Sequence, residues 1–185
     1  MIIRKSLSSD SETVTSCLFL AMQEILYKFI GEDDSRKAFA FMRYLVENEG
    51  NQYSWENCWV VEEEGRVVAA VNIYDGAKLH ALRKPVLDYI QSQFDLRINP
   101  EDETQAGEFY IDSLGVQPPY RCNGIATRLL KFLIDEYVIR QNQTLGLLVE
   151  ENNADAMRLY LRLGFKSVGR KVLLGKELFH LQLSR

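Results

Sequence analysis

One segment constrains the fold more than any other: an apolar strand runs into a glycine-bearing loop and then directly into a helix. The strand covers 109–116, the loop carries an R-x-x-G-x-A core (Arg121, Gly124, Ala126), and the helical run extends from Ile125 to Tyr137. At such a helix start, unpaired backbone N–H groups and the helix dipole both favour an anion. The segment therefore predicts a phosphate-bearing ligand at residues 117–128. The alternative is a plain strand-to-helix connection in which Gly124 only tightens a turn.

A second informative segment begins about 30 residues further on, at Leu148, and ends at Phe165. It has the pattern of a strand end, an Asn cap (Asn152 or Asn153), a helix and a Gly stop at Gly164. Helical spacing places four apolar residues on one face: Ala156, Leu159, Tyr160 and Leu163. By itself this is an amphipathic helix whose Tyr160 is a half-buried core residue.

Taken together, the two segments resemble the signatures of the GNAT superfamily of N-acetyltransferases. The acetyl-CoA loop of that family, Q/R-x-x-G-x-G/A, is matched by Arg121, Gly124 and Ala126. Its second signature is matched at the right spacing by Val149, Asn153, Ala156, Leu159, Tyr160, Gly164 and Phe165. The direct resemblance covers residues 108–165.

The resemblance implies one α/β (α+β) domain over residues 1–185, with a mixed, mostly antiparallel sheet flanked by helices. In that fold the fourth and fifth strands splay apart, and the pantetheine arm of acetyl-CoA lies between them. Cys122 and Asn123 occupy positions where relatives commonly have Gly and a basic residue. The loop therefore offers less positive charge to the pyrophosphate than many relatives do.

The resemblance also implies roles for particular residues. Backbone groups of Leu114 and Val116 would pair with the amides of the cosubstrate, and the Leu114 N–H would stabilise the oxyanion. The side chain of Asn153 would hold the pantetheine. Tyr160 would stabilise the leaving thiolate mainly by hydrogen bonding, because a phenol pKa of about 10 exceeds a thiol pKa of about 8.5. The pyrophosphate would be bound by backbone N–H groups of the loop: Arg121, Cys122, Asn123, Gly124, Ile125 and Ala126.

An amine acceptor needs a base, because an alkylamine with a pKa of about 10 is almost fully protonated at pH 7. The strand before the loop offers two carboxylates, Glu108 and Asp112. A period of two would place both on one face together with Tyr110 and Leu114. Asp112 is the preferred base because it is closer to the Leu114 donor. The alternative is that both carboxylates are solvated or pair with a neighbouring strand.

Composition narrows the function classes. The net charge is −4 with no basic stripe, so nucleic acid is not an expected partner. No run of 18 apolar residues is present, which argues against a membrane-spanning helix, and no apolar signal core follows Met1–Leu7. The 3 cysteines and 2 histidines lack metal or redox spacing, so we expect reduced thiols, no metal site and a cytoplasmic location.

The remaining elements follow from periodicity and turn residues. We expect a short strand at 2–4, helices at 9–30 and 33–46, a hairpin over 58–74, and two final strands around Gly175. A further helix is predicted from Pro85 to about Arg97, where it would shape the acceptor pocket. The acidic loop 99–103 is expected to be solvated rather than functional.

The sequence thus favours transfer of an acetyl group from acetyl-CoA to a primary amine of a small molecule or peptide, by direct attack in a ternary complex. The alternative is a non-catalytic acyl-CoA-binding or sensor module on the same fold. The strand carboxylates together with Asn153 and Tyr160 favour the enzyme, since a pure binder needs no carboxylate. A nucleotide-binding protein is not expected, because the Rossmann fingerprint and the P-loop lysine are absent. The sequence does not predict the identity of the acceptor, the length of the acyl group or the oligomeric state, for which a homodimer is one option.

Overall fold

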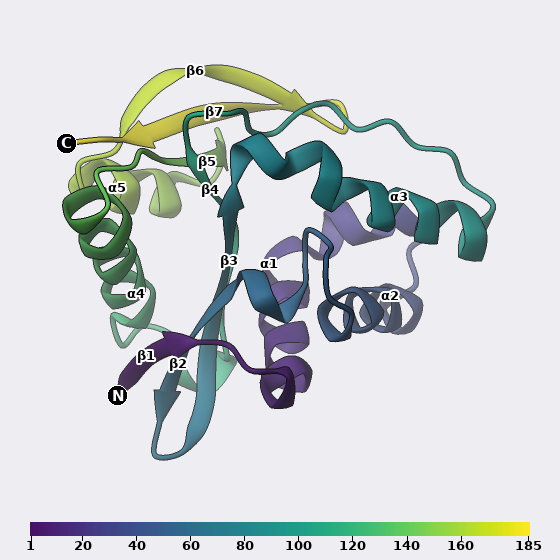
Figure 1. Ribbon diagram of the computed structural model, residues 1–185, viewed down its shortest axis with the longest axis horizontal. Coiled ribbons are helices and arrows are strands. Elements are labelled where there is room, and N and C mark those ends of the chain that lie inside the picture. The colour runs from purple at the N-terminus through teal and green to yellow at the C-terminus, as the bar shows by residue number, and fades with distance from the viewer.

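The computed structural model describes residues 1–185 as a seven-stranded sheet with helices on both faces (Figure 1). The strand order is β1-β2-β3-β4-β5-β7-β6, and every neighbouring pair is antiparallel except β4–β5. This confirms the predicted mixed, mostly antiparallel sheet. The strands are β1 (Ile2–Lys5), β2 (Cys58–Glu63), β3 (Arg66–Asp75), β4 (Phe109–Val116), β5 (Leu145–Glu150), β6 (Lys166–Leu173) and β7 (Lys176–Leu183).

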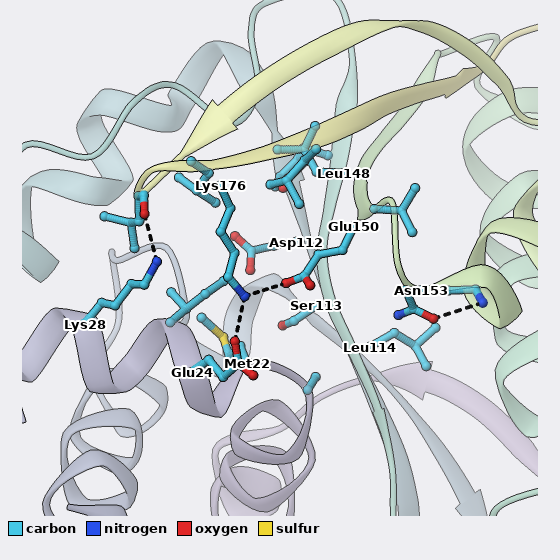
Figure 2. A pocket seen from close by; sticks show the side chains of 18 of the residues that line it. Met22, Glu24, Lys28, Asp112, Ser113, Leu114, Leu148, Glu150, Asn153 and Lys176 are labelled. Carbon is cyan, nitrogen blue, oxygen red and sulfur yellow. Dashed lines mark hydrogen bonds and ion pairs between the residues drawn. The ribbon is translucent and has the colours of Figure 1, made fainter. Parts of the chain in front are cut away.

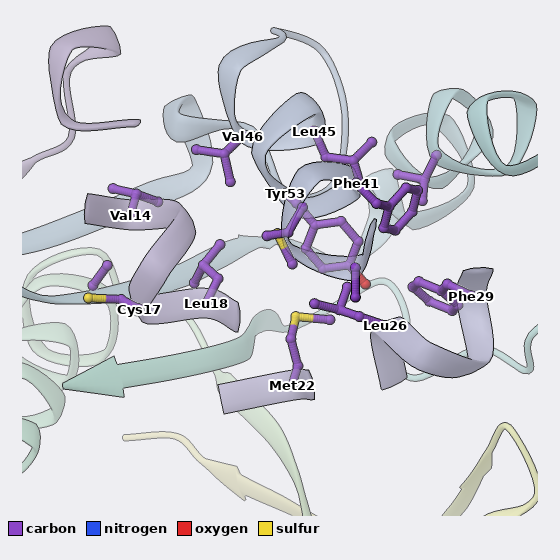
Figure 3. Close-up of a cluster of buried hydrophobic side chains, with 14 of the residues drawn as sticks. Val14, Cys17, Leu18, Met22, Leu26, Phe29, Phe41, Leu45, Val46 and Tyr53 are labelled. Carbon is purple, nitrogen blue, oxygen red and sulfur yellow. The ribbon is translucent and has the colours of Figure 1, made fainter. Parts of the chain in front are cut away.

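Helices cover the two faces unequally. α1 (Ser11–Ile30), α2 (Ser35–Glu47) and α3 (Leu79–Phe94) lie on one side, and α4 (Ile125–Leu133) and α5 (Ala154–Arg162) on the other (Figure 1). α4 continues as a π-helix over Ile134–Arg140. A cluster of 18 buried residues lies under the first group (Figure 3), and one of 17 lies under the second. The two clusters hold the sheet rigid between them, which fixes the positions of the strand ends that form the site.

α1 is the central helix of the larger cluster. With the turn before it, the run Ser8–Ile30 is long and apolar enough, by length and composition alone, to cross a membrane. Its apolar stripe is buried in the protein instead: Val14, Leu18 and Leu26 pack with Phe41 and Leu45 of α2 (Figure 3). This packing accounts for the apolar character of the helix. Non-helical dihedrals at Met22 mark a kink beside the cleft described below.

The prediction for α3 was wrong at its start. The helix begins at Leu79, and Pro85 lies inside it rather than in its first turn. An internal proline costs about 3 kcal/mol through a lost hydrogen bond and a steric clash. The helix forms nonetheless because four residues at helical spacing are buried on one face: Leu79, Arg83, Val86 and Ile90. Burial of this stripe outweighs the penalty.

The sheet has a gap between β4 and β5. The two strands pair at three positions only, Phe109↔Leu145, Tyr110↔Gly146 and Ile111↔Leu147. Beyond these pairs β4 continues along β3 to Val116, while β5 continues along β7 to Glu150. The predicted splaying of the fourth and fifth strands is therefore confirmed. A register shift opposite Asn72 and Ile73 leaves Asp112 as an extra, bulged residue of β4 at the point where the gap opens.

Candidate active site

A cleft of about 380 Å³ opens where β4 and β5 separate. Its walls include Ser113 and Leu114 of β4, Leu148 of β5, and Asn153 beside α5 (Figure 2). A second hollow of about 620 Å³ adjoins it, shares Ala21 and Leu114 with it, and extends over the loop before α4. The strand gap and the glycine loop predicted from the sequence thus belong to one crevice.

Backbone donors of β4 point into this gap. In an antiparallel pair, hydrogen-bonded and non-hydrogen-bonded residue pairs alternate. Because the Gln117 N–H donates to the Val68 carbonyl at 2.9 Å, the paired residues Leu114 and Val116 have their N–H groups turned away from β3. No β5 residue pairs with them there. The two positions named from the resemblance therefore present free donors to a ligand between the strands.

The loop before α4 has the geometry of an anion site. Cys122 and Gly124 adopt left-handed conformations, with φ of 63° and 73°. The first helical bond runs from the Arg128 N–H to the Gly124 carbonyl at 3.0 Å, which leaves the N–H groups of residues 125–127 without intrahelical partners. The Arg121 Nε donates to the Val116 carbonyl at 3.0 Å and so ties the loop to β4. Arg121 therefore stabilises the loop as well as adding positive charge.

Gly124 should be sensitive to any side chain. A Cβ built there would meet no protein atom within 4 Å, so the space above it is open to a ligand, while its φ of +73° strains any branched residue. We expect Gly124→Val to raise the KM for acetyl-CoA about tenfold or more, because side-chain bulk blocks close approach of the phosphates. Steady-state kinetics and calorimetric titration with acetyl-CoA measure this.

The matched control is Gly65→Val, which places the same residue at a φ of +75° in the β2–β3 turn, also with no atom within 4 Å of the new Cβ. Both variants carry the same backbone strain, so a similar loss of stability is expected in both. An unchanged KM in Gly124→Val, or an equal rise in both variants, would show that the anion site is elsewhere.

Asn153 and Tyr160 lie together on the α5 side of the cleft. The Asn153 Oδ1 accepts a hydrogen bond from the Ala156 N–H at 3.2 Å, so Asn153 is the helix cap and its amide NH₂ is still free to donate. The Tyr160 ring packs edge-on against Phe165 at 5.8 Å between centroids, and its hydroxyl makes no hydrogen bond within the protein. Burial raises the pKa of Tyr160, which keeps the phenol protonated at neutral pH.

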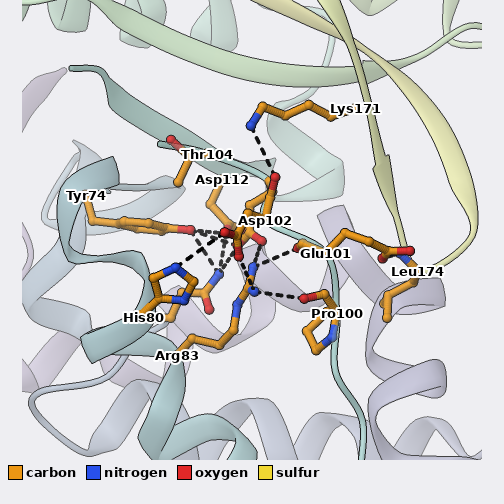
Figure 4. Close-up of polar contacts among 12 residues, drawn as sticks. Tyr74, His80, Arg83, Pro100, Glu101, Asp102, Thr104, Asp112, Lys171 and Leu174 are labelled. Atoms are coloured by element: carbon orange, nitrogen blue, oxygen red, sulfur yellow. Dashed lines mark hydrogen bonds and ion pairs between the residues drawn. The ribbon is translucent and has the colours of Figure 1, made fainter. Parts of the chain in front are cut away.

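Asp112 lies at the inner end of the cleft, in a polar network (Figure 4). Its Oδ2 accepts from the Gln52 Nε2 at 3.0 Å and the Tyr74 hydroxyl at 3.2 Å. The same two donors lie 2.6 Å and 3.0 Å from the Oε1 of Glu103. Burial raises the pKa of Asp112 to about 6, partly opposed by these hydrogen bonds. A carboxylate with this pKa is ionised at neutral pH and still able to take up a proton.

Glu108 and Asp112 have different surroundings, although the sequence pattern predicted that both lie on one face of the strand. Glu108 is buried just before β4 begins, where its carboxylate forms hydrogen bonds with Thr104, His180 and Gln182 at 2.7 to 2.8 Å. It lies against Gly146, whose missing side chain makes room for it, and it does not line the cleft. These hydrogen bonds lower the pKa of Glu108 against the opposing effect of burial. Glu108 therefore lies outside the cleft, hydrogen-bonded to two residues of β7, His180 and Gln182.

Asp112 and Leu114 also do not share a face. The bulge at Asp112 breaks the period of two, so that Leu114 packs toward the α4 side while Asp112 points to Gln52 and Tyr74 on the other. The prediction that period two aligns them was wrong for this reason. The group that Leu114 offers to a ligand in the gap is its backbone N–H.

The sequence pattern does not predict the residues that support Asp112. The loop 99–103 is not simply solvated: Glu103 is buried and forms an ion pair with Arg83 of α3. Arg83 also donates to the carbonyls of Pro100 and Glu101, at 3.0 and 3.1 Å, which fixes the loop (Figure 4). Gln52 lies in a stretch that reads as a polar loop but is buried. No local signal marks these residues, because their partners are tens of positions away.

The sequence profile described as the acetyltransferase (GNAT) family matches residues 21–165. The chain therefore belongs to the GNAT family of acetyltransferases, which confirms the resemblance of the two motifs. Acetyl-CoA is the cosubstrate of this family. The residues present fit this molecule: the free N–H groups of the loop and the open space at Gly124 suit its phosphates, and the unpaired edge of β4 suits its amides.

Solved structures agree in fold. An N-acetyltransferase from Staphylococcus aureus Mu50 is 20% identical, with a TM-score of 0.82 over 99% of this chain and 100% of that one. A Salmonella typhimurium protein solved with its cofactor acetyl-CoA is 20% identical, with a TM-score of 0.56 over 100% and 93%. The Escherichia coli ribosomal-protein-S18-alanine N-acetyltransferase is 19% identical, with a TM-score of 0.58 over 100% and 94%. At these identities the likeness concerns the fold alone. No curated protein sequence matches the chain.

Proposed function

We propose that this protein transfers the acetyl group of acetyl-CoA to a primary amine of a small molecule or peptide, by direct attack in a ternary complex. The observation that carries the proposal is the position of Asp112. Its carboxylate lines the same cleft as Leu114, whose free N–H points into the gap, and its pKa is raised by burial to about 6. A module that only binds acyl-CoA has no use for a buried carboxylate at that place.

Acetyl-CoA supplies an activated acetyl thioester: a nitrogen–carbon bond forms to the acceptor amine, and the carbon–sulfur bond breaks. The Leu114 N–H donates to the carbonyl oxygen as negative charge develops there, which can contribute about 3 kcal/mol. The amine gives up its proton to Asp112. An ammonium ion has no lone pair, so only the neutral amine attacks, and loss of that first proton to solvent costs about 4 kcal/mol at pH 7 for a pKa of about 10. The proton that Asp112 accepts is the one released as the nitrogen–carbon bond forms, because the bonded nitrogen is then strongly acidic.

Tyr160 completes the proton balance on the thiolate side. Its hydroxyl has no protein partner and lines the cleft beside Asn153. It donates a hydrogen bond to the departing thiolate, and because burial raises its pKa, the proton that finally neutralises the thiolate comes from solvent. We further propose a cytoplasmic location, in keeping with the free thiols of Cys17, Cys58 and Cys122.

The test is release of free thiol from acetyl-CoA in the presence of a panel of polyamines, aminoglycosides, amino acids and peptides. Amine-dependent release, with the acetylated amine identified by mass spectrometry, is the expected result. Binding of acetyl-CoA in calorimetry without release for any amine would contradict the enzyme and favour the sensor module. Release that does not depend on an amine would indicate hydrolysis and also contradict the proposal.

A further inference from the structure

The cleft between β4 and β5 carries more negative than positive charge. Three carboxylates line the cleft (Glu24, Asp112 and Glu150), against two ammonium groups (Lys28 and Lys176). Lys28 donates to the Leu174 carbonyl at 2.8 Å and also lies near Glu24 and Glu101. Behind Asp112, Arg83 and Glu103 neutralise one another. With Asp112 ionised, the side chains that line the cleft therefore carry a net negative charge, which one further cation would neutralise.

One of these cations already shows how an ammonium group is held at the mouth of the cleft. The Nζ of Lys176 lies 2.6 Å from Glu24 of α1 and 3.0 Å from Glu150 of β5, so it bridges opposite walls (Figure 2). All three side chains are partly exposed, at 37%, 77% and 42% respectively. Exposed pairs of this kind contribute little free energy, so another ammonium group can replace Lys176 at small cost.

A second observation, independent of these carboxylates, points to a ligand. Ser113 lines the cleft, is 7% exposed, and its Oγ has no hydrogen-bond partner. Buried hydroxyl groups are seldom left unpaired in folded proteins, because the missing hydrogen bond is costly. Ser113 follows Asp112 directly in β4, and both side chains line the cleft (Figure 2).

From these features we infer that the acceptor is an aliphatic diamine or polyamine. One amino group is acetylated next to Asp112 and Ser113, and the Ser113 Oγ accepts a hydrogen bond from it. The second, as an ammonium ion, takes the place of the Lys176 Nζ between Glu24 and Glu150. Acceptors with a carboxylate at the far end are disfavoured, because it would face Glu24 and Glu150. This inference rests on the proposed acetyl transfer to an amine and specifies its substrate class.

The test compares acceptors with one carbon skeleton: putrescine, n-butylamine and γ-aminobutyrate, followed by diamines of other lengths. The expected result is a higher kcat/KM for a diamine than for the monoamine, and the lowest for the amino acid. Calorimetric titration in the presence of coenzyme A provides a readout without turnover, and there the diamine should bind more tightly than the monoamine. Equal values for diamine and monoamine at every length, in both assays, would overturn the inference.

Substitutions of Glu24, Glu150 and Lys176 should shift the preference for a diamine in opposite directions, which a merely structural role would not produce. The diamine-to-monoamine ratio of kcat/KM should fall about two- to fivefold in Glu150→Gln and in Glu24→Gln, and rise in Lys176→Met, because the competing ammonium is removed. Ser113→Ala should lower kcat/KM for both acceptors. Glu47→Gln, an exposed carboxylate of α2 that pairs with Arg43, is the matched control and should leave the ratio unchanged.

The outcomes separate the two proposals. A ratio that stays constant across the Glu24, Glu150 and Lys176 variants would overturn the diamine site while acetyl transfer stands. Absence of thiol release with every amine would overturn the proposed acetyl transfer, and the calorimetric preference for a diamine would then report on the site alone.

Discussion

Replacing Asp112 with asparagine should lower kcat/KM for the amine acceptor by about two to four orders of magnitude. Asparagine keeps the size of the side chain and an oxygen for the Gln52 and Tyr74 donors, so the network should persist without a base. Calorimetry should show acetyl-CoA binding close to that of the unmodified protein. Asp88→Asn, which removes an exposed carboxylate of α3 paired with Lys84, is the control.

The pH profile makes this prediction sharper. Because burial raises the pKa of Asp112 to about 6, kcat/KM should rise with pH through that value as the carboxyl group loses its proton. A second rise should follow at higher pH, as the acceptor amine with a pKa of about 10 becomes neutral. Asp112→Asn should lose the first rise and keep the second. A variant that keeps the rise near pH 6 would show that another group acts as the base.

The second large effect is expected for Tyr160→Phe, which should lower kcat about ten- to a hundredfold. That range corresponds to one hydrogen bond to a charged group, about 1.5–3 kcal/mol. Phenylalanine keeps the ring that packs against Phe165, so the dissociation constant of acetyl-CoA should change little. The contrast between kcat and binding, from single-turnover kinetics and calorimetry, identifies a role in the departure of the thiolate.

The Tyr160 and Asp112 variants are distinguishable from one another. Tyr160→Phe should keep the rise in rate near pH 6, because that rise belongs to Asp112. Tyr44→Phe removes a phenol hydroxyl from an exposed ring stacked on Tyr89, and serves as the control for loss of a tyrosine. Unchanged turnover in Tyr160→Phe would exclude the proposed contact with the thiolate.

What the sequence predicts well is what a few neighbouring residues determine. Gly124 adopts a left-handed conformation at the start of α4, and Asn153 caps α5. The strand, loop and helix of 109–133 lie as their pattern indicates. These features depend on local hydrogen bonds and backbone sterics, which the chain encodes within one or two turns.

The surroundings of Asp112, the proposed base, could not be predicted in this way. Gln52 reaches Glu103 across 51 positions and Asp112 across 60, so only the tertiary fold brings them together. The direction of Asp112 depends on a bulge that arises from pairing with β3. Pro85 likewise lies mid-helix because of packing, not because of its own preference. The motifs therefore predict where acetyl-CoA would bind, whereas the surroundings of Asp112 can be described only from the coordinates.

The short seam between β4 and β5 has a consequence for the lifetime of the protein. Three residue pairs join the two halves of the sheet, and the edges beyond them have no strand partner. Acetyl-CoA bound at the proposed site would contact both edges, so it would stabilise the native state by an amount that grows with the logarithm of its concentration. At a concentration one hundred times its dissociation constant, the free energy of unfolding increases by about 2.7 kcal/mol. Scarcity of acetyl-CoA would thus leave the protein both idle and easier for proteases to degrade.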